Sequence, residues 1–151
     1  MLLRIALIVV LATSVMSSRA ESVPAQPFPL LELFAGIHRI EAEVAATADA
    51  RRFGLMERKS MPIQRGMLFV FPSLGKQCMW MRNTFLPLSV AFLDDSGRII
   101  NIEDMQPQTE ISHCASSPAR YALEMNLGWF RSRGLRSGTV LSGFEKVPKP
   151  Y

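Results

Sequence analysis

Short apolar runs separated by turn-forming residues dominate the middle of the chain. Met67–Phe71, Met79–Met81 and Leu88–Leu93 are bounded by Pro, Gly and Asp residues. Apolar runs of this length between turn formers are typical of buried β-strands rather than helices. The segment Gly66–Gly97 therefore predicts a mainly-β domain.

The flanking pattern extends this prediction to the whole domain. Alternation over His38–Thr47 indicates a half-buried strand, although its Ala and Glu residues would also suit a helix. Further strands are expected at Cys78–Arg82, Arg98–Glu103, Arg120–Met125 and Thr139–Glu145. Helices are expected at Thr47–Gly54 and Leu127–Arg133. Turns are expected at Pro72–Gly75 and Asp94–Gly97, and a long loop is expected over 104–118. About seven short strands with two short helices predict a compact β-sandwich or barrel.

The N-terminus has the three-part pattern of a secretory signal. A basic start, Met1–Arg4, precedes the mostly apolar Ile5–Met16, and small residues at Ser18 and Ala20 suit cleavage after residue 20. A buried helix or an uncleaved anchor is the alternative. We expect a signal peptide at 1–20, a proline-rich linker at 21–29, one domain at 30–146 and a tail at 147–151, with the mature protein periplasmic or secreted.

The charge of the mature protein is modest. Removing residues 1–20 removes Arg4 and Arg19, so the formal net charge falls from +4 to +2. No basic stripe with interleaved aromatic residues is present, and nucleic acid is therefore not an expected partner. We expect a monomer that, after signal cleavage, does not associate with the membrane and has a small molecule or an envelope protein as its partner.

The two cysteines, Cys78 and Cys114, can be interpreted in two ways. In a reducing compartment they would be free core thiols. In an exported chain an even pair favours a disulfide, which on the chain-entropy model would contribute roughly 3–4 kcal/mol to stability. The predicted export favours the disulfide.

Aromatic and polar residues follow Cys78 at the spacing of a binding surface. On a strand, Trp80 and Arg82 would share one face, which suits a planar or anionic ligand. An arginine stem lying over the indole at the domain rim is the simpler alternative. Asn83 and Thr84 are further candidate ligand-binding residues, but both types also stabilise turns.

Glu124 is the candidate acid. If it faces a cleft near Arg82, it could anchor a ligand or act as an acid or base. A hydrolase using Glu124 with Arg82 or Asn83 is therefore an alternative to simple binding. A purely structural role for Glu124 is the other alternative, either in an ion pair with an arginine or as a carboxylate bonded to backbone amides.

Metal and cofactor chemistry have little support in the sequence. Met79 and Met81 could bind Cu(I), but methionines at alternate positions of an apolar strand usually fill the core. His113 and Cys114 are sequence neighbours, which would point opposite ways on a strand. The chain has no Gly-x-Ser-x-Gly, Cys-x-x-Cys, phosphate-loop or His-Glu-x-x-His motif, so we expect no cofactor and no metal site, and favour a non-catalytic domain.

Several separate motifs, in order along residues 38–145, resemble the bacterial family named domain of unknown function 192. They are Gly54-Leu55-Met56, Gly66-Met67-Leu68-Phe69 with Phe71, Trp80-Met81 with Asn83-Thr84, Pro87-Leu88, Phe92 with Asp94, Gly97-Arg98-Ile99, and Leu123-Glu124 with Gly128. The resemblance implies a compact mainly-β domain, often exported, with no agreed reaction. The family usually has Asp after Pro-Leu, where this chain has Ser89, and this puts in doubt any mechanism that uses a carboxylate there.

Overall fold

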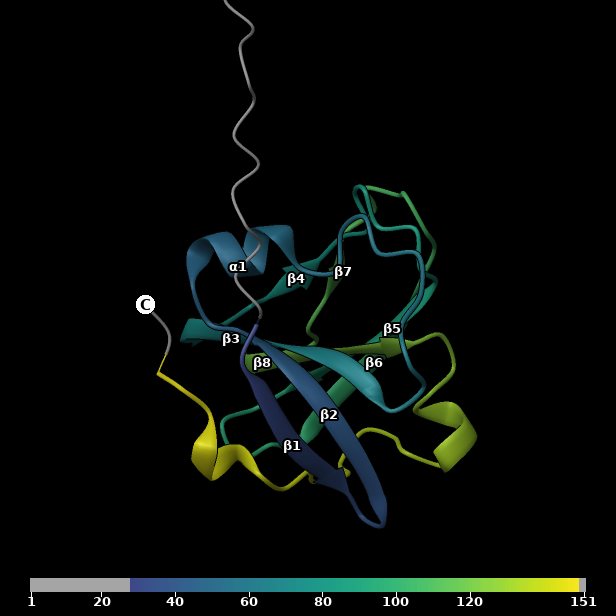
Figure 1. The fold of residues 1–151 in the computed structure, drawn as a ribbon. Helices are drawn as coiled ribbons and strands as arrows, with labels where there is room; N and C mark the ends of the chain where they lie inside the picture. Colours follow the sequence, from purple (N-terminus) through teal and green to yellow (C-terminus); the bar gives the residue numbers. More distant parts are fainter. Residues whose placement is uncertain (1–27, 150–151) are drawn as a thin grey trace, which may run out of the picture.

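Eight strands and three short helices make up residues 28–149, the part of the chain that the computed structural model describes (Figure 1). In chain order they are β1 (Leu30–Ala35), β2 (His38–Ala45), α1 (Ala48–Phe53), β3 (Arg65–Gly75), β4 (Cys78–Met79), β5 (Leu88–Leu93), β6 (Ile99–Met105), β7 (His113–Cys114), β8 (Ala119–Asn126), and two 3-10 helices at Arg131–Arg133 and Phe144–Lys146. The predicted signal peptide, residues 21–27 of the predicted linker and the last two residues of the tail lie outside this range.

Six strands form one sheet in the order β1-β2-β3-β8-β5-β6, and β4 pairs with β7 in a separate two-stranded sheet. Neighbours in the large sheet are antiparallel except β2 and β3, which are parallel because α1 lies in the connection between them. The mainly-β class is confirmed. The large sheet is not closed, since β1 and β6 are its two edges, so the expected sandwich or barrel is not established.

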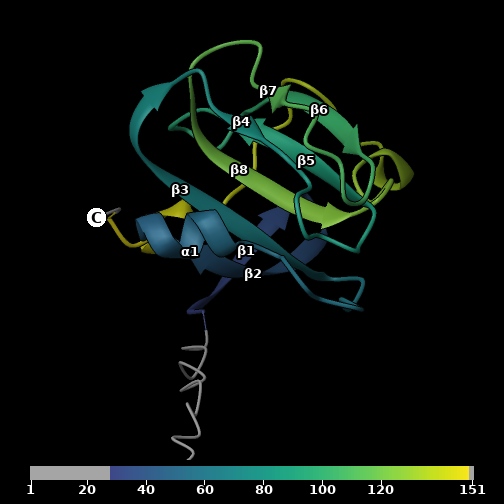
Figure 2. The ribbon, with the colours of Figure 1, turned by 90° about the horizontal axis from the view of Figure 1, so that it is seen from above.

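The last strand in the chain lies inside the sheet. β8 pairs with β3 on one side and β5 on the other, and Figure 2 shows β3 and β8 running side by side. Both faces of a strand in this position are covered, so its side chains alternate between two interior layers.

Long periodic segments were predicted well. The strand expected over His38–Thr47 is β2, and Leu88–Leu93 is β5 as predicted. The helix expected after Thr47 is α1, whose first turn is capped by a hydrogen bond of 3.1 Å from the Ala50 amide to the Thr47 hydroxyl. Gly54 ends this helix with a φ of 52°.

Three of the other predicted elements are wrong in extent or type. The strand predicted over Cys78–Arg82 is only the two residues of β4, because its partner β7 is equally short. The helix predicted over Leu127–Arg133 is a turn followed by a 3-10 helix, although Gly134 ends it with a φ of 67°. The strand predicted over Thr139–Glu145 is instead two isolated bridges and a 3-10 helix.

Two strands were missed and one was underestimated. β1 was not predicted because its exposed positions include Leu30 and Phe34, which hide the alternation. β7 lies within the expected loop 104–118. The turn expected at Pro72–Gly75 belongs to β3, which continues past an irregularity between Val70 and Gly75.

The two faces of the large sheet carry separate apolar clusters. One, the α1 face, includes Met67, Phe69 and Phe92, and it is covered by Leu55 beyond α1 and by Met79 of β4. The other, the C-terminal face, is covered by Trp129, Phe130 and Leu141 among other residues. In Figure 1, α1 and the β4–β7 pair accordingly lie on one side of the sheet, and the C-terminal segment lies on the other.

Residues 138–142 connect the two edges of the sheet at one end. The Ser142 and Phe34 backbones exchange two hydrogen bonds of 2.9 and 3.0 Å at β1. The Leu141 amide donates to the Gly97 carbonyl at 2.9 Å, just before β6. Within residues 28–149 no helix has both the length and the apolar character needed to cross a bilayer.

A single glycine allows β3 and β8 to pack closely. A Cβ atom on Gly66 would lie 2.3 Å from the Met125 sulfur and 2.4 Å from the Glu124 carbonyl oxygen. We expect Gly66→Ala to lower the free energy of unfolding by about 3 kcal/mol, because the backbone of β8 would have to move. Urea unfolding measures this change.

Gly75→Ala is the matched control at the other end of β3. Its Cβ would meet nothing closer than 3.6 Å, so we expect a change of less than about 1 kcal/mol. Equal stability losses in the two variants would show that the close approach at Gly66 does not matter.

Candidate functional site

A pocket of about 240 Å³ opens on the α1 face between α1 and β4. Its floor is formed by β3 and β8. Its walls come from the end of α1 with the turn that follows, and from β4 with the residues just after it. The lining residues are Arg51, Arg52, Phe53, Gly54, Leu55, Met56, Phe69, Phe71, Cys78, Met79, Trp80, Thr84 and Glu124.

Glu124 lies at the floor of this pocket, in the middle of β8. Register places it between Met67 of β3 and Val90 of β5, both fully buried apolar residues. Only 3% of Glu124 is exposed. Burial raises its pKa to about 8, because removal from water disfavours the charged form. Within residues 28–149 no hydrogen bond or ion pair to this carboxyl group opposes that effect.

A second buried glutamate, Glu43, differs from Glu124 because its carboxylate has hydrogen-bond partners. Glu43 on β2 faces the same side of the sheet, opposite Met67 in register. It accepts two hydrogen bonds from the Arg58 guanidinium, at 2.7 and 2.5 Å. Phe28 lies 5.9 Å from the same guanidinium. Glu43 is thus a structural ion pair, whereas Glu124 has no such partner.

Two further predicted residues join Glu124 in the pocket. Trp80 forms part of the wall and is 44% exposed. Thr84 is buried, and its hydroxyl donates to the Arg82 carbonyl at 3.2 Å. Alternating burial continues from Cys78 to Arg82 even though the strand ends at Met79, so Trp80 and Arg82 share the exposed side of this segment.

Arg82 and Asn83 do not line the pocket. The Arg82 guanidinium lies 5.7 Å from the Trp80 ring and its Nε is 3.5 Å from Glu110. This matches the simpler expectation of an arginine over an indole at the rim. Asn83 has a φ of 53°, and its carbonyl accepts from the Glu57 amide at 2.9 Å, as a turn residue would.

The α1 wall of the pocket was not foreseen from the sequence. The sequence pattern places Arg52 and Phe53 in a predicted helix and Gly54 at its end and in a family motif, and it assigns none of the three to a binding site. Arg51 donates to the Ala46 and Val70 carbonyls at 2.6 and 3.0 Å, which ties α1 to β2 and β3. A Cβ on Gly54 would lie 3.1 Å from the Phe69 ring, so this glycine also brings the turn close to the floor.

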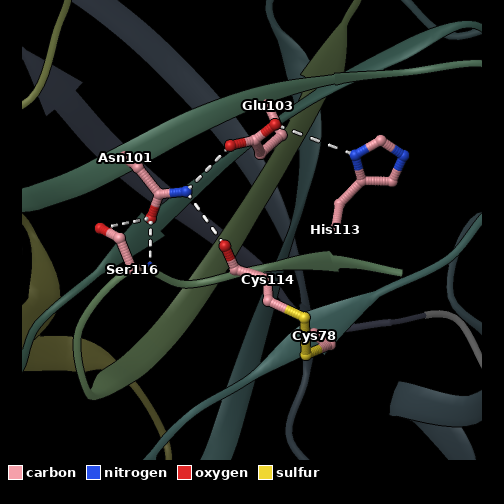
Figure 3. Close-up of a disulfide and its surroundings, with 6 residues drawn as sticks. All are labelled: Cys78, Asn101, Glu103, His113, Cys114 and Ser116. Carbon is pink, nitrogen blue, oxygen red and sulfur yellow. Dashed lines mark hydrogen bonds and ion pairs between the residues drawn. A yellow bond between two sulfur atoms is a disulfide. The ribbon is translucent and has the colours of Figure 1, made fainter. Parts of the chain in front are cut away.

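The β4 wall is held in place through the predicted disulfide. A Cys78–Cys114 bridge joins β4 to β7 (Figure 3). Asn101 on β6 donates to the Cys114 carbonyl at 3.1 Å and accepts from the Ser116 amide at 3.0 Å. The large sheet is therefore linked to the pocket wall through Asn101, β7 and the disulfide. His113 lies 4.0 Å from Glu103 beside this network.

Ser89, where the family usually has Asp, faces away from Glu124. Its hydroxyl donates to Asp104 at 2.6 Å and accepts from the Gly128 amide at 2.8 Å. The hydrogen bond from Ser89 lowers the pKa of Asp104, and the hydrogen bond and positive charge of Arg131 lower it further. Together they hold this pKa below its usual value despite partial burial. Asp104 thus supplies a carboxylate beside Ser89, at a second depression of about 410 Å³.

The residues considered for metal are part of the apolar packing. Met79 and Met81 both belong to the cluster on the α1 face. Among the residues described, no three His, Cys, Asp or Glu side chains are grouped as a metal site would require.

Removing the disulfide should weaken the fold. The bridge closes a loop between positions 36 residues apart. We expect the double variant Cys78→Ser/Cys114→Ser to lose about 3–4 kcal/mol of unfolding free energy in urea. A reductant should destabilise the parent similarly and leave the variant unchanged; a parent insensitive to reductant would contradict the expectation.

The stability of the protein should depend on pH through Glu124. Its folded pKa of about 8 exceeds the ordinary value of 4.5, so between these values the folded state binds the extra proton and stability falls as pH rises. Glu124→Gln removes this dependence. As pH rises, the free energy of unfolding of the variant should increase relative to that of the parent by up to about 1.4 kcal/mol per pH unit. Urea unfolding from about pH 5 to pH 8 measures this difference.

Glu145→Gln, on the exposed surface, controls for the substitution itself. Parallel pH profiles for the parent and Glu124→Gln would show that the carboxyl group titrates normally.

The comparisons with known proteins agree on the fold. A protein from Sinorhizobium meliloti 1021, provisionally described as a transcription regulator, is 32% identical with a TM-score of 0.74; the match covers 78% of this chain and 96% of that chain. A protein of unknown function from Novosphingobium aromaticivorans DSM 12444 is 27% identical with a TM-score of 0.74, over 80% of this chain and 89% of that chain. No curated protein matches.

The family match agrees with the motif resemblance. The model of domain of unknown function 192 (DUF192), described as "Uncharacterized ACR", matches residues 31–143. This range includes every strand of the large sheet except the first residue of β1, and it includes the whole pocket. The chain therefore belongs to the DUF192 family.

Proposed function

We propose that this protein is an exported domain that binds a small molecule in the pocket between α1 and β4 without altering it chemically. The observation that carries the proposal is Glu124. A carboxyl group that is 3% exposed and has no partner within residues 28–149 is costly to the fold. A ligand that bonds to it would offset that cost, which is a physical reason for an otherwise unfavourable residue to lie at the end of a pocket.

Binding is favoured over hydrolysis because, in the part of the chain that the structure describes, the pocket lining lacks the residues expected to assist Glu124. The hydrolase alternative needs Arg82 or Asn83 beside the carboxyl group, and neither lines the pocket. The other polar lining groups are Thr84, bonded to a carbonyl, and the two arginines of α1. The mechanism expected from the sequence pairs Glu124 with Arg82 or Asn83, and neither residue is among these lining groups.

Export is supported by the signal-like start of the sequence and by the disulfide. Disulfides persist in oxidising compartments and are rare in the cytosol. The transcription-regulator description of the Sinorhizobium protein is not extended to this chain, because its sequence has no basic stripe with interleaved aromatic residues.

Native mass spectrometry of the protein isolated from its own envelope fraction tests the proposal. We expect a chain that lacks residues 1–20, a mass two hydrogens below the reduced form, and a retained small molecule. Glu124→Leu should lose at least about tenfold in retained ligand, because the polar anchor is removed.

Arg82→Ala is the matched control, since Arg82 lies outside the pocket. It should keep the ligand. Retention of the same ligand by Glu124→Leu, or release by both variants alike, would place the binding site elsewhere.

A further inference from the structure

The walls of the pocket give information about the chemistry of its ligand. Four aromatic side chains, Phe53, Phe69, Phe71 and Trp80, line the same pocket as Glu124. They come from α1, β3 and the segment after β4, so they lie on its floor and on both walls. Aromatic faces attract cations, and the attraction strengthens when water is excluded.

The charged groups that line the pocket also give information about the charge of the ligand. Besides Glu124, the only lining residues that carry charge are Arg51 and Arg52. Arg51 is bonded to the Ala46 and Val70 carbonyls, and Arg52 is paired with Asp49 on the surface. Glu124 is therefore the only charge-bearing group of the lining without a partner in residues 28–149.

We propose that the ligand carries a protonated amine attached to an apolar or aromatic body, with the ammonium group bound to the carboxylate of Glu124 among the aromatic side chains. This inference rests on the proposed function and specifies the class of ligand. An ammonium group in this position gains both an ion pair and contact with aromatic rings. A carboxylate ligand would instead lie against the carboxyl group at the floor.

The size of the pocket suits such a molecule. An apolar cavity of about 150 Å³ holds a benzene ring in other proteins. At about 240 Å³, this pocket has room for a ring with a short polar arm. Its single unpartnered polar group at the floor suits a ligand that enters with its charged end first.

Binding of an ammonium group requires Glu124 to give up its proton. The carboxyl group releases one proton to solvent and becomes a carboxylate, while the ligand keeps its own proton and positive charge. Because the pKa of Glu124 is about 8, each unit of pH below that value should weaken binding about tenfold. The charged groups on this face include Arg51 and Arg52 of α1 and the Glu43–Arg58 pair. They also include Glu103 of β6, which is opposite Val90 in the same cross-strand row as Glu124 and whose Oε2 lies 4.0 Å from His113 Nδ1. The arginines stay charged throughout this range.

Four probes that share one ring but differ in the polar group test the inference: benzylamine, benzyl alcohol, benzamide and benzoate. Binding to the full mature protein is measured by calorimetry at about pH 6, 7 and 8 in two buffers of different ionisation enthalpy. We expect benzylamine to bind at least tenfold more tightly than the other three at pH 8. Its affinity should rise with pH, with close to one proton released per molecule bound at pH 6.

Two variants distinguish the contribution of the Glu124 carboxyl group to binding from that of the other lining residues. Glu124→Gln keeps the shape but cannot become charged, so it should lose the preference for benzylamine and the proton release. Glu103→Gln, outside the pocket lining, should retain both.

The possible outcomes distinguish this inference from the proposed function. If benzyl alcohol, benzamide or benzoate binds best, or if benzylamine binds without releasing a proton, the ligand class is wrong and binding in the pocket stands. The class is also wrong if the molecule retained by the envelope protein has no amine. If no probe binds and no molecule is retained, both proposals fail.

Discussion

The arrangement of this protein depends on one constraint, the position of β8 between β3 and β5 with both of its faces covered. Side chains of β8 must alternate between two closed layers, because the strand has no solvent-exposed face. Leu123 and Met125 meet this requirement with apolar side chains on the C-terminal face, and Glu124 does not meet it on the other. The carboxyl group lies at the floor of the pocket, so its position in the site follows directly from the topology of the sheet.

The cover over Glu124 consists of two pieces that are anchored differently. The α1 piece is fixed by the Arg51 guanidinium on backbone carbonyls and by the close approach of Gly54 to Phe69. The β4 piece has a short ladder with β7 and depends on the disulfide and on Asn101. One wall is therefore held by hydrogen bonds to the sheet and the other by a covalent cross-link. A reducing environment would remove the cross-link from the second wall, whereas the hydrogen bonds that hold the first wall do not depend on the redox state.

The sequence predicted elements whose local pattern matches their environment. β2, α1 and β5 have clear periodicity and end signals, and the structure follows them. β1 was missed because exposed Leu30 and Phe34 break the alternation, and the two-residue strands β4 and β7 exist only because they pair with each other and share the disulfide.

Glu124, Trp80 and Thr84 were found as candidates from residue type and order. The contribution of α1 could not be found in this way, because the distance from Phe53 to Trp80 across the pocket depends on the parallel crossover between β2 and β3. Tertiary contacts of this kind leave no local signal in one sequence.

The order of the strands also has a consequence for how the chain is made. β8 begins at residue 119 and is the last strand to leave the ribosome, yet the hairpin β1–β2 with β3 and the hairpin β5–β6 meet only through it. Residues 138–142, which join the two outer strands, emerge later still. Pairing across such long sequence separations is slow, so the nascent polypeptide has no complete sheet until synthesis is nearly finished. This order suits the export proposed above, because a translocation channel that accepts only extended polypeptide would receive the chain before the sheet is complete.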